Sequence, residues 1–276
     1  MKSPKLILTD LDGTLLRNDK HLSPANRAAL ERASAQGCQV VLATGRSYGS
    51  LPQELRSLPF LRYFIFLNGA KVYDLKTDSI LYRAEISADL TERLFDFLES
   101  LDLSMDCYQN DRGLIDQKYY ARLDYYVVDL AAREHERQQR TPVDDFRGVV
   151  RAGGGAIQKI QCFLPHPELA PSVIRQIHEA FPDVELSSSL PGNLEINAPG
   201  ATKGAALLAL CRTLALPPEE TAAFGDGTND LTMLREAGVG VAMANAAPEV
   251  LEAADLIAPS NQEDGVAKVL AQWFGA

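Results

Sequence analysis

Short apolar runs alternate with helix-like segments in the first part of the chain. The run 6–8, followed by Thr9, has the length of a buried strand, and similar runs occupy 39–43 and 63–67. Between the first two runs, Ser23 followed by Pro24 is typical of a helix start, and Gly37 is typical of a helix end. Strands that alternate with crossover helices predict an α/β fold with a Rossmann-like, doubly wound parallel sheet.

The last quarter of the chain repeats this alternation. Thr202 is suited to begin a helix that runs through 207–210, and apolar runs at 222–224 and 239–242 predict two further strands. A short helix through 231–234 is expected to end at Gly238, and 248–254 and 266–274 predict two last helices. Both ends of the chain are therefore expected to build one core.

The middle of the chain, from about 83 to 192, has a different composition. It is richer in aromatic and charged residues, with tyrosine pairs at 119–120 and 125–126 and a glycine run at 153–155. The full length of 276 residues also exceeds one typical domain. We therefore expect an α+β cap domain of residues 83–192 inserted into a core of residues 1–82 and 193–276. The charged segment 133–140 is expected to be a solvated helix face rather than a binding face.

Composition and charge limit the class of partner. The chain is 46% hydrophobic and 23% charged, as expected of a globular protein with a sizeable core. A net charge of -10 argues against a nucleic-acid surface, which needs clustered Lys and Arg, but leaves room for a small anionic metabolite. No apolar run approaches the roughly 20 residues of a membrane helix, and the first run stops at Asp10, too early for a signal peptide. A cytoplasmic protein without a membrane partner is expected.

The cysteines give no sign of a metal site or a disulfide framework. Four are present, far apart and without C-x-x-C spacing, at positions 38, 107, 162 and 211. Scattered cysteines of this kind are expected to be small core residues. The oligomeric state is not indicated by any pattern in the sequence.

Polar residues stand where four of the predicted strands end. They are Asp10 and Asp12, Thr44 and Gly45, Asn68 and Gly69, and the segment from Asp226 to Asp230. The carboxyl ends of parallel strands lie along one edge, which Lys203 can also reach from its helix start. Acidic side chains there suit Mg2+, which prefers oxygen ligands, while Lys203, Thr44 and free backbone N–H groups suit a phosphoryl group. A Walker-type phosphate loop is absent from the sequence.

Four segments resemble the motifs of the haloacid dehalogenase (HAD) phosphatase superfamily. They are DLDGTLL at 10–16, TGR at 44–46, Lys203, and GDGTND at 225–230, and their order and wide spacing match. The large insertion between the second and third motifs resembles the α/β cap of the Cof-type sugar-phosphate phosphatases. Asn68-Gly69-Ala70 and Leu194-Glu195-Ile196 are also similar to that subgroup. The resemblance covers both halves of the core, and the insertion only by its size and position.

The resemblance implies a role for each motif residue. Asp10 would be the nucleophile that forms an aspartyl-phosphate, and Asp12 the general acid and then the base. Mg2+ would be held by Asp10, by the backbone carbonyl of Asp12 and by Asp226, with Asp230 as a ligand through water or a supporting partner. The groups that bind phosphoryl oxygens would be Thr44, Lys203, Asn229 and the amides of Leu11 and Gly45. Gly13 and Thr14 are expected to shape the turn.

Each of these residues also has a purely structural alternative. Thr44 could cap the next turn, and Asp226 and Asp230 could serve as turn and N-cap residues at a helix start. Lys203 taken alone would be a surface lysine, and Arg46 could contact substrate or pair with a surface acid. The leading hypothesis is a Mg2+-dependent phosphatase acting on a small phosphorylated metabolite such as a sugar phosphate. A phosphomutase and a catalytically silent sugar-phosphate sensor are the alternatives. The sequence does not indicate the substrate specificity. Four residues of the insertion could line a substrate pocket, or could equally belong to its core or surface: Tyr108, Arg112, Lys118 and Tyr119.

Overall fold

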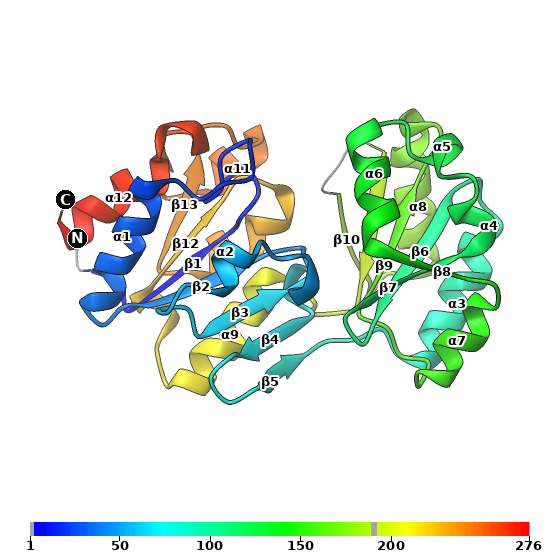
Figure 1. Cartoon of the computed structure of the whole chain (residues 1–276), viewed down its shortest axis with the longest axis horizontal. Helices are drawn as coiled ribbons and strands as arrows, with labels where there is room; N and C mark the ends of the chain where they lie inside the picture. The colour runs from blue at the N-terminus through cyan, green and yellow to red at the C-terminus, as the bar shows by residue number, and fades with distance from the viewer. Residues whose placement is uncertain (1–2, 189–191, 276) are drawn as a thin grey trace. The chain divides into compact units, whose positions relative to one another are not determined.

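The chain forms two compact units in a computed structural model that describes residues 3–188 and 192–275. The first, here called the core unit, comprises Met1–Arg46, Leu51–Arg83 and Thr202–Ala276. The second, the inserted unit, comprises Ser47–Ser50 and Ala84–Ala201. Each unit is built on its own β-sheet with helices packed against it (Figure 1).

The core unit contains strands and helices from both ends of the chain. The strands are β1 (Leu6–Thr9), β2 (Gln39–Ala43), β3 (Tyr63–Phe66), β4 (Lys71–Asp74), β5 (Ser79–Arg83), β12 (Thr221–Gly225), β13 (Val239–Met243) and β14 (Leu256–Ala258). The helices are α1 (Pro24–Ala35), α2 (Gln53–Arg56), α9 (Lys203–Leu214), α10 (Leu231–Glu236), α11 (Pro248–Ala253) and α12 (Gly265–Phe274). The eight strands form one sheet in the order β14-β13-β12-β1-β2-β3-β4-β5. Neighbouring strands from β14 to β3 are parallel, whereas β4 and β5 extend the sheet in antiparallel fashion.

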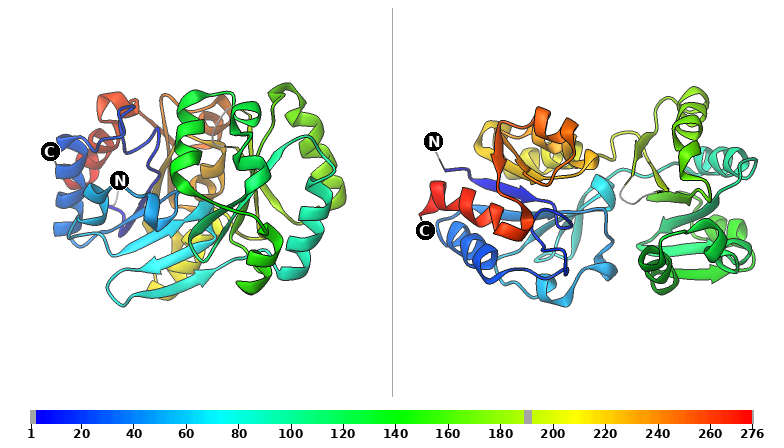
Figure 2. Two further views of the ribbon diagram at one scale, coloured as in Figure 1. Left: turned by 45° about the vertical axis from the view of Figure 1, so that its right-hand side comes forward. Right: turned by 90° about the horizontal axis from the view of Figure 1, so that it is seen from above.

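Helices cover both faces of the core sheet (Figure 2). On one face α1 packs against α12, whose Trp273 ring meets the Phe224 ring of β12 edge to face. On the other face α9, α10 and α11 contribute residues such as Leu207 and Leu234 to a buried cluster with the strands. The predicted doubly wound α/β fold is therefore confirmed. The antiparallel strands β4 and β5 and the last strand β14 were not predicted.

The local signals in the core sequence act as expected. The Ser23 side chain accepts a hydrogen bond from the Asn26 amide at 3.1 Å and caps α1, with Pro24 at its first position. Thr202 caps α9 in the same way, through a 3.1 Å bond from the Ala205 amide. These caps satisfy backbone N–H groups that have no partner inside the helix.

The inserted unit has a mixed α+β architecture. Its elements are α3 (Ala88–Leu98), β6 (Ser104–Gln109), β7 (Arg112–Asp116), α4 (Gln117–Tyr120), α5 (Leu123–Tyr126), α6 (Leu130–Gln139), β8 (Arg140–Val143), α7 (Phe146–Ala152), β9 (Lys159–Phe163), α8 (Ala170–Ala180), β10 (Glu185–Ser187) and β11 (Asn193–Asn197). The six strands form a sheet in the order β10-β11-β9-β6-β7-β8, antiparallel except for the parallel pair β7 and β8.

Two expectations about the insertion differ from the structure. Strand β11, which the sequence analysis assigned to the core, pairs with β9 and β10 in the sheet of the inserted unit. The segment 133–140 is helical up to residue 139, but Glu136 and Arg140 are buried rather than solvated. The Arg140 guanidinium donates a 2.7 Å hydrogen bond to Asp106 and lies 3.1 Å from Glu136, so one buried cation contacts both carboxylates inside the unit. Long-range pairing that local sequence does not encode determines both features.

The remaining general expectations concern cysteines and membrane helices. All four cysteines are free and buried, which confirms that they are small core residues. Within the described ranges, no helix combines the length and the apolar character needed to cross a membrane.

Candidate active site

The candidate site lies at the point of the core sheet where the strand order changes direction, between β1 and β12. Strand β1 is central, with β2 and β3 on one side and β12 to β14 on the other. In open α/β sheets, this switch point creates a crevice beyond the carboxyl ends of the strands. Asp10 follows β1, Thr44 follows β2 and Asp226 follows β12, so the topology brings the predicted motif residues to this edge.

Lys203 connects two of the predicted acids. It is the first residue of α9 and is fully buried. Its Nζ lies 2.7 Å from Oδ1 of Asp10 and 2.5 Å from Oδ1 of Asp230. Gly69, after β3, allows this close packing, because its φ is +106° and a Cβ there would lie 2.1 Å from the Thr202 carbonyl oxygen. Lys203 is thus part of the site rather than a surface lysine.

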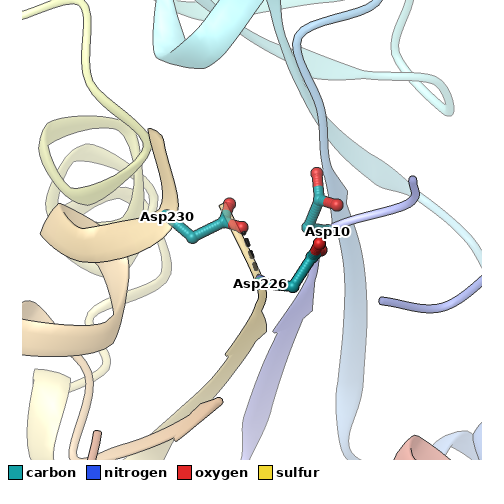
Figure 3. Close-up of side chains that lie close together, drawn as sticks. All are labelled: Asp10, Asp226 and Asp230. Carbon is teal, nitrogen blue, oxygen red and sulfur yellow. Dashed lines mark hydrogen bonds between the residues drawn. The ribbon is translucent and has the colours of Figure 1, made fainter. Parts of the chain in front are cut away.

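Three carboxylates meet beside this lysine. Oxygen atoms of Asp10, Asp226 and Asp230 lie within 4.8 Å of one another, and Figure 3 shows the side chains converging from β1 and from the segment after β12. The second oxygen of Asp230 accepts hydrogen bonds from the amides of Asp226 and Gly227, both at 2.9 Å. Asp230 therefore does fix the local turn, but its other oxygen faces Lys203.

The turn after β1 holds Asp226 in place. The Thr14 hydroxyl donates a 2.6 Å hydrogen bond to Oδ1 of Asp226, a contact that the sequence analysis missed although Thr14 belongs to the DLDGT motif. Gly13 has a φ of +90°, and a Cβ on it would lie 2.2 Å from an Asp226 oxygen. Only glycine permits this approach without displacing the carboxylate.

The acids of the cluster outnumber the cations that contact them. Burial, with Asp230 and Asp226 nearby, raises the pKa of Asp10 to about 8 despite the opposing effect of Lys203. Burial is also the main cause that raises the pKa of Asp226 to about 6. Three carboxylates share the one ammonium group of Lys203, so the cluster lacks positive charge. A donor set of closely spaced carboxylate oxygens fits a hard divalent cation such as Mg2+.

Asp12 has partners of its own. Arg46 binds its carboxylate with two hydrogen bonds of 2.7 Å, and Lys20 adds a third at 2.9 Å. Although burial opposes it, the bonds from Arg46 and Lys20 lower the pKa of Asp12 to about 2. Arg46 therefore pairs with a site acid rather than with a surface acid. Nothing in the spacing of Lys20 pointed to this contact, because it depends on the fold of the turn after β1.

The residues predicted to bind phosphoryl oxygens lie at the same edge. Thr44 is buried, and its hydroxyl oxygen accepts a 3.1 Å hydrogen bond from the backbone amide of Arg46. This contact caps the local turn, as the structural alternative for Thr44 predicts. The hydroxyl proton of Thr44 remains available as a donor. None of the backbone hydrogen bonds between described residues uses the N–H groups of Leu11 and Gly45.

Asn229 is linked to this group of donors through Asn68. Its side-chain amide donates to Oδ1 of Asn68 at 3.1 Å. Asn68 is buried in the left-handed conformation, with a φ of 58°, and its side chain lies against Gly45. The Asn68-Gly69 pair that marked the strand end in the sequence thus supports the site, and asparagine is one of the few residues that tolerate this backbone conformation.

Comparison with known proteins gives consistent results over nearly the whole chain. Residues 7–270 match a family model described as haloacid dehalogenase-like hydrolase. Phosphatase YwpJ of Bacillus subtilis (strain 168) is 31% identical over 283 residues, covering 96% of this chain and 98% of that protein. A 5-amino-6-(5-phospho-D-ribitylamino)uracil phosphatase of the same organism, YcsE, is 29% identical and covers 98% of this chain and 95% of its own length.

A solved structure agrees with the sequence relatives. A haloacid dehalogenase-like hydrolase from B. subtilis superposes with a TM-score of 0.84 at 30% identity, covering 96% of this chain and 98% of the other. The family match, the phosphatase relatives and the shared fold all extend over both units. The chain therefore belongs to the haloacid dehalogenase-like hydrolases and is a phosphatase of that family.

Proposed function

We propose that this phosphatase hydrolyses a small phosphomonoester, a sugar phosphate or related metabolite, by Mg2+-dependent transfer of the phosphoryl group to Asp10 and then to water. The observation that carries the proposal is the position of Asp10, at the switch point of the sheet and in contact with the buried Lys203. A carboxylate held by a cation among other acids suits a nucleophile that must attack an anionic phosphoryl group.

The surrounding donors suit the oxygens of that group. Lys203 supplies a fixed charge, Thr44 a hydroxyl proton, and Asn229 an amide. The free N–H groups of Leu11 and Gly45 add two backbone donors. Donors fixed in position before the reaction stabilise developing charge without a reorganisation cost. Bound Mg2+, with Asp10, the Asp12 carbonyl and Asp226 as ligands and Asp230 in support, would neutralise the phosphoryl oxygens and polarise phosphorus.

These assignments give a reaction of two steps, in which Asp12 first donates a proton and then accepts one. In the first, an Asp10 oxygen bonds to phosphorus, the bond to the alcohol oxygen breaks, and that oxygen takes a proton from Asp12. In the second, water attacks the phosphorus of the aspartyl-phosphate, gives a proton to Asp12, and releases phosphate and the Asp10 carboxylate. The ionised Asp12 bound to Arg46 and Lys20 is the form that accepts the proton in the second step. For the first step Asp12 must leave these cations and become protonated.

Two observations support a sugar phosphate or related metabolite as the substrate: the name of a relative, and the groups that the core residues leave unassigned. The name of the relative YcsE specifies a phosphorylated ribityl compound, a small metabolite with a polyol phosphate. The assigned core residues account for the phosphoryl group but not for the alcohol that leaves. We therefore assign the choice of the leaving group to the inserted unit, whose size and place in the sequence resemble the cap of the Cof-type phosphatases.

The test is phosphate release by the Asp10→Asn variant. With p-nitrophenyl phosphate and Mg2+, this variant should lose activity by about a thousand-fold or more, because an amide is not a nucleophile. Glu252→Gln, an exposed acid on α11, is the matched control and should keep wild-type turnover. Mass spectrometry of acid-quenched wild-type enzyme should find a phosphoryl group on Asp10. Normal turnover by Asp10→Asn, or interconversion of two sugar phosphates without free phosphate, would contradict the proposal.

A further inference from the structure

A cavity of about 400 Å³ lies within the inserted unit. Its lining residues come from the segment after α3 and from the short helices α4 and α5 with the residue between them, all in the inserted unit (Figure 1). Leu101 and Leu103 form an apolar part of its wall, and two tyrosines, Tyr119 and Tyr126, form another. Its volume is in the range of sites that bind small molecules, and its wall combines these apolar groups with the charged side chains of Glu99, Lys118 and Arg122.

The two tyrosines present unused hydroxyl groups. Tyr119 and Tyr126 are only 7% and 6% exposed, and their rings meet edge to face with centroids 5.7 Å apart. Among the described residues, neither hydroxyl has a hydrogen-bond partner, and neither is a fully buried atom. Both tyrosines line the cavity, so their hydroxyls are the free donors nearest to it within the described residues. Burial raises the pKa of Tyr119 to about 12, so its hydroxyl keeps its proton and can donate.

Arg122 brings a positive charge to the same cavity. Its guanidinium carbon lies 4.7 Å from the centre of the Tyr125 ring and 5.4 Å from that of Tyr126. In the part of the chain that the structure describes, no carboxylate forms an ion pair with Arg122. Arg122 is an exposed residue, and its position over the rings is a cation–π contact that does not use its N–H donors.

The other charged groups of the wall neutralise one another. The Lys118 ammonium lies 3.2 Å from a Glu99 oxygen and 3.2 Å from an Asp116 oxygen. The second oxygen of Glu99 accepts a 2.9 Å hydrogen bond from Arg147. The charges on Lys118 and Glu99 are thus compensated within the unit, and Arg122 is left as the uncompensated charge at the cavity.

We propose that this cavity binds a small organic carboxylate with a flat apolar body. The body packs against Leu101, Leu103 and the tyrosine rings, and the carboxylate accepts hydrogen bonds from the Arg122 guanidinium and the tyrosine hydroxyls. Arg binds carboxylates through parallel N–H donors, and an aromatic or alicyclic body of modest size fills the remaining volume. The proposal is independent of the phosphatase reaction, because its ligand carries no phosphate ester.

The first measurement uses 2-naphthoate as the probe, titrated into the full-length protein by saturation-transfer NMR. The uncharged 2-naphthalenemethanol has the same ring system and is the control ligand. Naphthoate should bind with a Kd of about 1 mM or tighter, and the alcohol at least about ten-fold more weakly. Absence of naphthoate binding up to about 10 mM, or equal binding of the two probes, would overturn the proposal.

Variants then locate the site. Arg122→Met should weaken naphthoate binding about ten-fold or more, and Tyr126→Phe, which keeps the ring, should weaken it by a smaller factor of about two to five. Arg112→Met, at an exposed arginine at the start of β7, is the matched control and should bind like wild type. All three should keep their turnover of p-nitrophenyl phosphate, which shows that they are folded. Unchanged binding by Arg122→Met, as expected if the probe occupied the active site instead, would refute the assignment.

Discussion

Replacing Lys203 by methionine should leave the carboxylates of Asp10 and Asp230 without the cation that contacts them, and should therefore lower the free energy of unfolding. The Lys203 side chain is 0% exposed, and its Nζ makes two short contacts, 2.7 Å to Asp10 and 2.5 Å to Asp230. Methionine fills a similar volume but removes the ammonium group that contacts Asp10 and Asp230. The change therefore tests the electrostatic balance of the site with little change in its packing.

The size of the effect follows from the burial of these contacts. Removing one partner of a buried ion pair costs about 3–5 kcal/mol, because the remaining charge has neither solvent nor counter-ion. We expect Lys203→Met to lose about this much free energy of unfolding at neutral pH in the presence of EDTA. Mg2+ that binds only the folded state should restore part of the loss, about 2.7 kcal/mol at a hundred times its Kd. Adding Asp230→Asn to Lys203→Met should also recover stability, since it removes one of the uncompensated charges.

Urea unfolding followed by circular dichroism, with EDTA or with Mg2+, measures both effects. Lys268→Met, an exposed lysine on α12, is the control and should change stability by no more than about 0.5 kcal/mol. A loss below about 1 kcal/mol in EDTA would refute the view that Lys203 compensates the acids. No stabilisation by Mg2+ of either wild type or Lys203→Met would refute the view that the cluster lacks positive charge.

Two further predictions concern charged contacts away from the active site. The pKa of Asp74 is lowered to about 2, chiefly by hydrogen bonds from Arg62, so its stabilising contribution is present above pH 4 and is lost as the pH falls towards 2. Asp74→Asn should therefore cost about 1–2 kcal/mol in urea unfolding at pH 5 and clearly less at pH 2.5, whereas a constant difference would contradict this contact. In the inserted unit, Arg140→Met should cost about 3–5 kcal/mol by leaving Asp106 and Glu136 buried without their partner. Hydrogen exchange should then rise across β6 and β8, and an unchanged exchange pattern would count against a structural role for this cluster.

The elements that the sequence predicted well are those with local causes. The start of α1 depends on Ser23 and Pro24, and the start of α9 depends on Thr202, all within one helical turn. The convergence of Asp10, Thr44 and Asp226 was predictable for a related reason. Once the alternation of strands and helices indicates a parallel sheet, its strand ends must share one edge.

The features that the sequence did not reveal depend on contacts between distant segments. Strand β11 joins the inserted unit because it pairs with β9 about thirty residues earlier in the chain, and its own residues fit either sheet. Lys20 and Arg46 reach the same carboxylate of Asp12 from different loops. Neither their types nor their spacing distinguishes them from surface cations.

The sequence alone therefore indicated the kind of fold and the edge of the sheet where the motif residues meet, and it predicted the pair Asp10 and Asp12 as the centre of the site. Hydrophobic periodicity and helix caps depend on neighbouring residues, and motif order is a property of the sequence itself, so all three can be recognised without a structure. The tertiary structure decided the charge state of that pair. Asp10 shares the buried Lys203 with Asp230, whereas Asp12 is held ionised by Arg46 and Lys20. Burial and through-space charge determine protonation, and both exist only once the chain has folded.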